Sequence, residues 1–306
     1  MTQHDPVRHS PLATPTATRS VLERHDISLK KSLGQNFLIN DDVIGKILRL
    51  SGVNDSDFVL EVGPGIGTLT YALLETVKAV ISIERDKELP SVLEDTLSAH
   101  RERFYLVSKD ALDVQVIDLN NAADALGLDS LPNKLVANLP YSVAATIVLD
   151  YFERFSSIES MTVMVQREVA ERMMAKPKTK NYGAYTVKLS LFAKYAGSFS
   201  VGPGNFMPPP HVESTVIKLE RRSDLAESKE LIKASCMMAD AAFTARRKTI
   251  SNSCRQYFSG RDKKIADSVN EILECAHIDP GVRGEALTTQ QFLDLGKAFI
   301  DFCHVR

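Results

Sequence analysis

A glycine-rich segment at residues 58–69 limits the possible folds of this chain more than any other part of it. Its first five residues form the apolar, valine-rich run expected of a strand that is covered on both faces. Glycines follow at 63, 65 and 67, where a missing side chain permits a tight turn and lets a ligand lie against bare backbone. The segment therefore predicts a buried strand, a turn that can hold a ligand, and the start of a helix.

A second apolar run, residues 79–83, ends on Glu84, about twenty positions beyond the glycines. An acidic residue at the tip of this next strand can accept hydrogen bonds from ribose hydroxyls, which predicts an adenosine-bearing cofactor. The third glycine of the G-x-G-x-x-G fingerprint is missing, which disfavours a nicotinamide dinucleotide. S-adenosylmethionine and a dinucleotide both stay open at this point, and a plain strand-to-helix turn is the alternative to either.

Strand-like and helical patterns alternate through the first two thirds of the chain, which predicts an α/β fold with a doubly wound, mostly parallel sheet. Further strands are expected at residues 104–107, 134–137 and 161–165, and a closing pair of strands at 187–196 and 215–219. Ligands of such sheets bind beyond the carboxyl ends of the strands. That edge would bring together the residues at the ends of strands one to four: Gly63, Glu84, Asp110 and Asn138.

Residues 138–141, Asn-Leu-Pro-Tyr, carry the most specific chemistry. An aromatic amine is a poor nucleophile because its lone pair is delocalised into the ring. The Asn138 side-chain oxygen and the carbonyl before Pro140 could accept both N–H bonds of such an amine, while Tyr141 offers a face on which an extruded base can stack. A sulfonium methyl placed in line would complete a direct displacement that needs no metal and no strong base, with catalysis mainly by positioning and electrostatics. A plain strand-ending turn is the alternative.

The ends of the chain differ in character from its centre. Residues 1–25 are rich in Pro, Thr, Ser and His without apolar periodicity, which predicts a disordered N-terminal tail. Residues 29–40 mix cations and amides with the apolar anchors Phe37 and Leu38, and could form either an N-terminal clasp or a lid over the ligand of the glycine turn. From about residue 223 onward, short amphipathic helical patterns predict a small second domain.

Composition sets outer limits on function. The formal net charge of −2 does not indicate a general nucleic-acid binder, so any such binding must rest on local patches. No apolar run approaches the length of a membrane span. The four cysteines are widely spaced and form no C-x-x-C pair, which suits reduced thiols in a cytoplasmic protein better than disulfides or a zinc site.

Several segments, in order, resemble the rRNA adenine N6-dimethyltransferases: residues 35–38 (QNFL), 61–67 (EVGPGIG), 138–141 (NLPY) and 206–214 (FMPPPHVES). Two more resemble the helical domain of the bacterial small-subunit enzymes: residues 242–249 (AFTARRKT) and 283–287 (RGEAL). The resemblance runs from about Lys30 to the C-terminus and is highly specific, because many motifs occur in the right order. Ser142 and Val143 depart from the commoner continuation after Tyr141.

The resemblance implies a Rossmann-like class I methyltransferase sheet over residues 26–222, which binds S-adenosylmethionine, and a helical RNA-contacting domain over residues 223–306. It further implies dimethylation of N6 on two adjacent adenosines in the 3′-terminal hairpin loop of small-subunit (16S) rRNA, with a role in small-subunit biogenesis. The expected partner is a precursor of the small ribosomal subunit. The enzyme is expected to be a cytoplasmic monomer with no membrane association.

The resemblance also implies roles for individual residues. The positions expected to bind the cofactor are Asn36, Leu38, Gly63, Gly65, Glu84, Asp110 and Asn138. Glu84 would bind the ribose and Asp110 the adenine amine, while Asn36 and Leu38 would lie near the methionine end and make the N-terminal loop a lid. The expected catalytic group is Asn138, Pro140, Tyr141 and Phe206. Phe206 either stacks on the target base opposite Tyr141 or anchors its loop in the core.

Two basic clusters are candidates for RNA contact. One is Arg246, Arg247 and Lys248, and the other is Lys176, Lys178 and Lys180. Both could hold phosphates, and solvated surface charge is the alternative for each. Other functions stay open: a large-subunit rRNA methyltransferase, a DNA adenine N6-methyltransferase, and a mainly non-catalytic ribosome-assembly factor. The DNA enzyme is disfavoured because no target-recognition domain is visible, and the RRKT-containing helical domain favours the small subunit over the large one.

Overall fold

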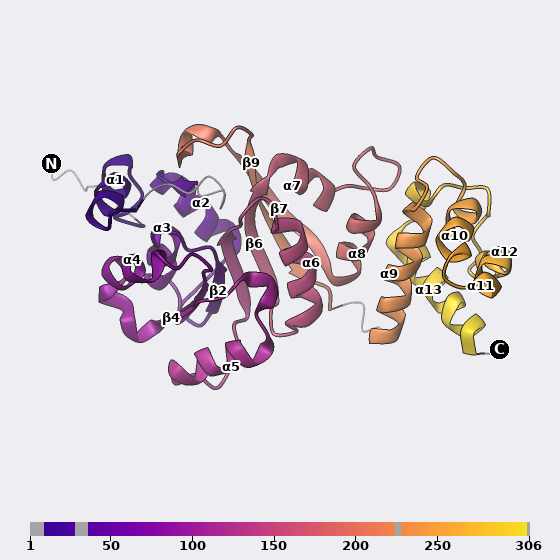
Figure 1. The fold of residues 1–306 in the computed structure, drawn as a ribbon, viewed down its shortest axis with the longest axis horizontal. Helices are drawn as coiled ribbons and strands as arrows, with labels where there is room; N and C mark the ends of the chain where they lie inside the picture. Colours follow the sequence, from indigo (N-terminus) through magenta and orange to yellow (C-terminus); the bar gives the residue numbers. More distant parts are fainter. Residues whose placement is uncertain (1–8, 28–35, 224–227, 305–306) are drawn as a thin grey trace. The chain divides into compact units, whose positions relative to one another are not determined.

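The computed structural model describes residues 9–27, 36–223 and 228–304 (Figure 1). The chain divides into two compact units. The first, which we call the sheet unit, consists of Met1–Ala170 and Tyr195–Arg221, and the second, the helical unit, consists of Glu171–Lys194 and Arg222–Arg306. The expected division between residues 222 and 223 differs from this because Glu171–Lys194 and Arg222 belong to the helical unit.

A seven-stranded sheet with the order β4-β3-β2-β5-β6-β9-β7 forms the centre of the fold. Its strands are β2 (Phe58–Val62), β3 (Ala79–Ile83), β4 (Phe104–Val107), β5 (Lys134–Asn138), β6 (Ser160–Gln166), β7 (Ala193–Val201) and β9 (Ser214–Arg221). Strands β2 to β6 are parallel, and β9 runs antiparallel to β6. The predicted α/β fold with a mostly parallel sheet is confirmed. All five residues of β2, and all five of β3, are buried, as their apolar sequences require.

Helices follow most of the strands of the sheet unit: α2 (Asp41–Ser51), α3 (Thr68–Leu74), α4 (Leu89–Thr96), α5 (Val116–Ala125), α6 (Ala144–Arg154) and α7 (Arg167–Met173), the last of which ends in the helical unit. Helix α2 shows how the sequence sets these bounds. Asn40 caps its first turn by accepting a hydrogen bond from the Asp42 amide, and Gly52 ends it in the left-handed region. Its buried Ile44 and Ile47 share a core cluster with Val59 of β2.

A separate two-stranded ribbon joins segments that are far apart in the sequence. Strand β1 (Phe37–Leu38) pairs antiparallel with β8 (Phe206–Met207), so that Leu38 lies opposite Phe206. The ribbon attaches the segment just before α2 to the proline-rich segment before β9. It thereby fixes Asn36 and Phe37 next to the carboxyl edge of the sheet, where both line the cavity described below.

The helical unit contains α8 (Ala184–Phe192), α9 (Lys229–Phe243), α10 (Ile250–Ser259), α11 (Lys263–Asp267), α12 (Val269–Cys275) and α13 (Thr289–His304). A strand was predicted at residues 187–196, and this is wrong for residues 187–192, which belong to α8. Val187, Leu189 and Leu191 alternate with more polar residues, which mimics the two-residue period of a strand. All three are buried, and Val187 packs in the core cluster of the helical unit.

The prediction of a disordered tail over residues 1–25 is wrong for residues 9–25, while residues 1–8 lie outside the described residues. Helix α1 (Pro15–Arg24) begins after the cap Thr14 and buries Val21 and Leu22. These two side chains share a cluster with Phe37 and with apolar residues of the sheet unit: Leu12, Ile66, Leu89 and Val92. The composition of this segment did not indicate a helix, because α1 has few apolar residues. They stabilise the helix only by packing against this apolar surface of the sheet unit.

Ion pairs and hydrogen bonds hold the segment before α1 and the C-terminal end of the helix. The backbone amides of His9 and Ser10 donate to the carboxylate of Asp41, over 3.0 and 2.8 Å. At the other end, Arg24 and His25 both contact Asp95 of α4. Within the described ranges, no helix is long and apolar enough to cross a membrane.

Candidate active site

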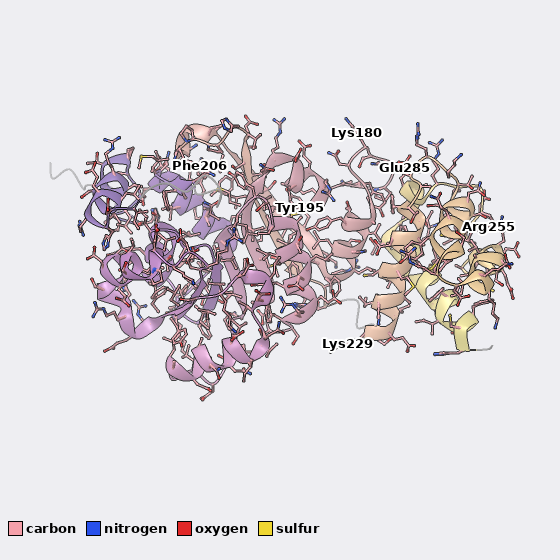
Figure 2. The ribbon with its side chains drawn as sticks, in the orientation of Figure 1. Lys180, Tyr195, Phe206, Lys229, Arg255 and Glu285 are labelled. Carbon is pink, nitrogen blue, oxygen red and sulfur yellow. The ribbon has the colours of Figure 1, made fainter. Side chains whose placement is uncertain are left out.

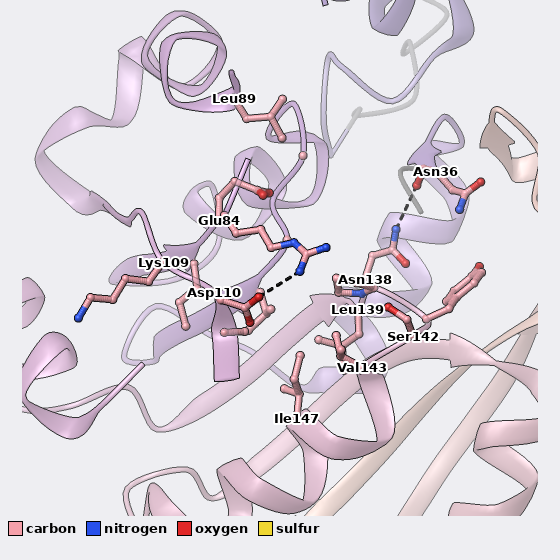
Figure 3. A pocket seen from close by; sticks show the side chains of 18 of the residues that line it. Asn36, Glu84, Leu89, Lys109, Asp110, Asn138, Leu139, Ser142, Val143 and Ile147 are labelled. Carbon is pink, nitrogen blue, oxygen red and sulfur yellow. Dashed lines mark hydrogen bonds and ion pairs between the residues drawn. The ribbon is translucent and has the colours of Figure 1, made fainter. Parts of the chain in front are cut away.

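A cavity opens beyond the carboxyl ends of the central strands (Figure 3). The structure brings to it all four residues expected at the strand ends, Gly63, Glu84, Asp110 and Asn138. Apolar side chains complete the wall: Val62, Ile83, Leu89, Leu139, Val143 and Ile147. Its mixture of apolar walls with a few polar groups suits a small organic ligand.

The glycine turn supplies bare backbone to one side of the cavity. Gly63 and Gly65 have φ angles of 73° and 60°, in the left-handed region that disfavours residues with side chains. A Cβ on Gly65 would also lie 3.0 Å from the ring of Phe37. Backbone conformation therefore favours glycine at both positions, and the Phe37 ring also leaves little space for a side chain at Gly65. Without side chains, the turn leaves room for a ligand to lie against the main chain.

Two carboxylates stand at the ends of β3 and β4. The Glu84 carboxylate accepts a hydrogen bond of 2.8 Å from the Asp86 amide, and burial raises the pKa of Glu84. Asp110 accepts a 3.0 Å bond from the Leu112 amide and a second, also 3.0 Å, from Arg85, whose guanidinium lines the cavity (Figure 3). These two donors lower the pKa of Asp110, so that it stays an anionic acceptor with a fixed orientation.

The Asn138 side chain enters the cavity with a defined orientation. Its Nδ2 donates a 3.3 Å hydrogen bond to the backbone carbonyl of Asn36, and the side-chain oxygen points the other way (Figure 3). Among the described residues, no donor bonds to that oxygen, which can accept hydrogen bonds. Leu139 and Pro140 line the cavity beside it, and Pro140 has no N–H of its own. The end of β5 therefore presents acceptors for an amino group.

Tyr141 and Phe206 occupy different places. Tyr141 lines the cavity, and its hydroxyl lies 2.6 Å from the Ser214 hydroxyl. Burial raises the pKa of Tyr141, so the phenol stays protonated. Phe206, labelled in Figure 2, is 2% exposed, belongs to the core cluster that contains Leu38, and is absent from the cavity lining. This position matches the core-anchor alternative for Phe206, and Leu38, 4% exposed, is buried in the same way.

Arg246 connects the two basic clusters of the helical unit. The Arg246 guanidinium pairs with Glu285 at 3.2 Å and donates to the backbone carbonyls of Thr179 and Lys180, over 3.3 and 2.6 Å. Arg246 is therefore engaged in holding the loop at residues 176–180. The remaining cations of the two clusters are exposed: Lys176, Lys178, Lys180, Arg247 and Lys248.

Sequence reasoning missed the contacts of Arg85, which lines the cavity, and of Ser214, which lies outside the cavity and contacts Tyr141. Each had a signal in the sequence: Arg85 directly follows Glu84, and Ser214 ends the segment 206–214 that carried the resemblance. Neither side chain could be assigned a partner without the fold. Arg85 follows β3 and contacts Asp110 after β4, whereas Ser214 begins β9 and contacts Tyr141 after β5.

The lining fits S-adenosylmethionine. Glu84 can accept from ribose hydroxyls, Asp110 can accept from an adenine amine, and the apolar residues between them can cover a purine. The bare turn at Gly63 and Gly65 leaves space for the methionine part. Within the described ranges, no cluster of three or more His, Cys, Asp or Glu side chains is placed to hold a metal ion.

Residues 27–294 match the family model described as "Ribosomal RNA adenine dimethylase". The ribosomal RNA small subunit methyltransferase A of Enterococcus faecalis is 37% identical over 287 residues, covering 94% of this chain and 96% of that protein. A dimethyladenosine transferase from Plasmodium falciparum superposes with a TM-score of 0.72 at 23% identity, covering 88% and 98% of the two chains. The 23S rRNA methyltransferase ErmE gives 0.61 at 24%, covering 86% and 99%. These likenesses confirm the predicted fold, a Rossmann-like class I methyltransferase sheet with a C-terminal helical region.

Proposed function

Because this chain belongs to the ribosomal RNA adenine dimethylase family, we propose that its targets are two adjacent adenosines in the 3′-terminal hairpin loop of 16S rRNA, each dimethylated at N6. The family and the fold make it an S-adenosylmethionine-dependent rRNA adenine N6-dimethyltransferase. The substrate is a precursor of the small ribosomal subunit, and the enzyme acts as a monomer in the cytoplasm.

The observation that carries this proposal is the orientation of Asn138. With its Nδ2 committed to the Asn36 carbonyl, the side-chain oxygen can accept one N–H of a target adenine amine. The Leu139 carbonyl, which precedes Pro140, is the acceptor for the other N–H. Two acceptors on one amine draw it toward tetrahedral geometry and direct its lone pair, so the residues lower the barrier by positioning and electrostatics.

The remaining lining residues hold the two reactants in register. Glu84 and Asp110 would hold the nucleoside part of the cofactor, and Asn36 with the glycine turn would hold its methionine end. When bound, S-adenosylmethionine supplies an electrophilic methyl group on its sulfonium. Tyr141 gives the extruded target adenine a face on which to stack, which places the amine beside Asn138.

RNA contact is assigned to the exposed cations of the helical unit. Arg247 and Lys248, together with the lysines at 176, 178 and 180, can neutralise phosphates, which gives affinity that falls as salt rises. Arg246 was expected to contact phosphate, but its guanidinium instead holds the lysine loop at residues 176–180. Its role is to join the two clusters into one RNA-binding surface.

A methyl-transfer assay with separated substrates tests the proposal. The protein is incubated with labelled S-adenosylmethionine and, in parallel, with undermethylated small subunits, large subunits and duplex DNA. We expect label in N6,N6-dimethyladenosine of 16S rRNA, mapped by digestion to two neighbouring nucleotides. Label confined to large subunits or DNA would overturn the substrate assignment, and the likeness to ErmE makes the large-subunit arm the essential control.

A further inference from the structure

Ser214, at the end of the proline-rich segment, contacts the active-site residue Tyr141. The segment runs from Phe206 to Ser214, and Phe206 at its start is buried in the core. At its end, the Ser214 hydroxyl lies 2.6 Å from the Tyr141 hydroxyl, which it contacts across 73 residues of sequence. Ser214 has no exposed surface, and Tyr141 is half-buried.

The backbone around Ser214 is fixed on both sides. Ser214 is the first residue of β9 and lies opposite Gln166 of β6. Its neighbour Glu213 accepts a 3.0 Å hydrogen bond from the Arg167 amide, and its carboxylate accepts a second bond of 2.7 Å from the Arg167 side chain. Ser214 is therefore a rigid anchor, set by the pairing of two strands.

A tyrosine ring held only at its Cβ can swing about two side-chain torsions. The bond to Ser214 holds the opposite end of the Tyr141 ring as well, so the plane of the ring is set from both ends. Stacking of a base depends on that plane. Without the serine hydroxyl, a partly buried phenol would lose its partner, and the ring would gain by turning toward water.

We propose that Ser214 is a positioning residue for the target adenine, which holds the Tyr141 ring in the plane on which the base stacks beside Asn138. This inference rests on the proposed function for the identity of the base. Ser214 itself touches neither the cavity nor the base, and acts through Tyr141. The proposal gives the FMPPPHVES segment a role in catalysis that its aromatic residue does not have.

A double-mutant cycle tests the proposal with four proteins: wild type, Tyr141→Phe, Ser214→Ala and the double variant. Each single variant removes one hydroxyl of the pair, and we expect kcat/KM for small subunits to fall about tenfold in each, mostly through KM. The double variant should be no worse than either single one, because both changes break the same bond. The Kd for S-adenosylhomocysteine should stay unchanged throughout. Losses that multiply in the double variant, or a fully active Ser214→Ala, would overturn the proposal.

A readout that needs no substrate separates this inference from the proposed function. With 3-fluorotyrosine at position 141, wild type should give one narrow 19F resonance and Ser214→Ala a broadened or shifted one. Thr215→Val is the matched control, since it removes a hydroxyl from the next residue of β9, which faces the other side of the sheet. If wild type methylates only other substrates while the resonance responds as expected, the substrate assignment fails and the anchoring role stands. A resonance that is identical in wild type and Ser214→Ala contradicts the anchoring role.

Discussion

The side-chain amide of Asn138 donates a hydrogen bond of 3.3 Å to the backbone carbonyl of Asn36, 102 residues earlier in the chain. This bond links the segment before α2 to the end of β5, and it sets which atom of the Asn138 amide remains free to accept. The resemblance implied that the N-terminal loop covers the cofactor. Of its described part, Asn36 and Phe37 line the cavity, whereas Leu38 is buried in the core and does not. Residues 29–35 lie outside the described residues.

Helix α1 packs against side chains that line the cavity. Leu22→Ala should lower the free energy of unfolding by about 2–3 kcal/mol, because Leu22 is buried in the cluster that holds Phe37 and Leu89. Since both of those side chains line the cavity, the Kd for S-adenosylhomocysteine should also rise. Urea unfolding and calorimetry measure the two effects, with the exposed Glu23→Ala on the same helix as control. Unchanged affinity in a destabilised Leu22→Ala protein would show that α1 does not shape the site.

Glu61 should make stability depend on pH. It is 1% exposed, accepts hydrogen bonds from the Thr70 and Ser82 hydroxyls, and burial raises its pKa from 4.5 to about 7. The folded state thus binds this proton more tightly than the unfolded chain. The stabilisation is present in full below pH 4.5 and is lost as pH rises to 7 and beyond.

Glu61→Gln keeps an acceptor for both hydroxyls and removes the titration. The variant should therefore gain stability relative to wild type as pH rises from 4 to 8, by about 3 kcal/mol for a shift of this size. Unfolding of the cofactor-free proteins across that range measures the difference. A difference that stays constant with pH would mean that Glu61 remains ionised in the folded protein.

Arg85 should control recognition of the cofactor's adenine amine, because it orients the Asp110 carboxylate. Arg85→Leu removes a charge-assisted hydrogen bond, and the Kd for S-adenosylhomocysteine should rise about tenfold. The Kd for S-inosylhomocysteine, which lacks the amine, should change little. Calorimetry with both ligands tests this, and equal losses for the two would assign Arg85 a general role in the pocket. Arg85→Lys is the control, because lysine keeps the positive charge but lacks the planar guanidinium group.

Arg246 and Arg247 are neighbours with different predicted effects. Arg247→Ala should weaken small-subunit binding and reduce the slope of log affinity against log salt by about one, with no change in amide exchange. Arg246→Ala should instead speed amide hydrogen exchange at residues 178–182, because two carbonyl contacts and the Glu285 pair are lost. Identical exchange in both variants would show that Arg246 does not hold the lysine loop.

The sequence was most informative where one local pattern decides the structure. The runs at 79–83 and 104–107 predicted the bounds of β3 and β4. A short apolar run with polar residues on both sides has few possible structures other than a strand. The strand ends then placed Gly63, Glu84, Asp110 and Asn138 at one cavity, since a parallel sheet aligns its carboxyl ends.

Features that depend on distant partners could not be read in this way. Helix α1 needs the surface formed by Phe37 and Leu89, and the strand-like alternation of α8 is overridden by packing in the helical unit. Phe206 carried the expected residue type, yet its pairing with Leu38 places it in the core. The partners of Arg85, Ser214 and Arg246 were likewise set by tertiary contacts.

Asn138→Ala tests the central claim most directly. Single-turnover transfer of labelled methyl groups to undermethylated small subunits is measured alongside the Kd for S-adenosylhomocysteine. Loss of an acceptor for the adenine amine should slow transfer by about 100-fold or more, while cofactor affinity stays within a few fold of wild type. Transfer by Asn138→Ala at the wild-type rate would contradict the account.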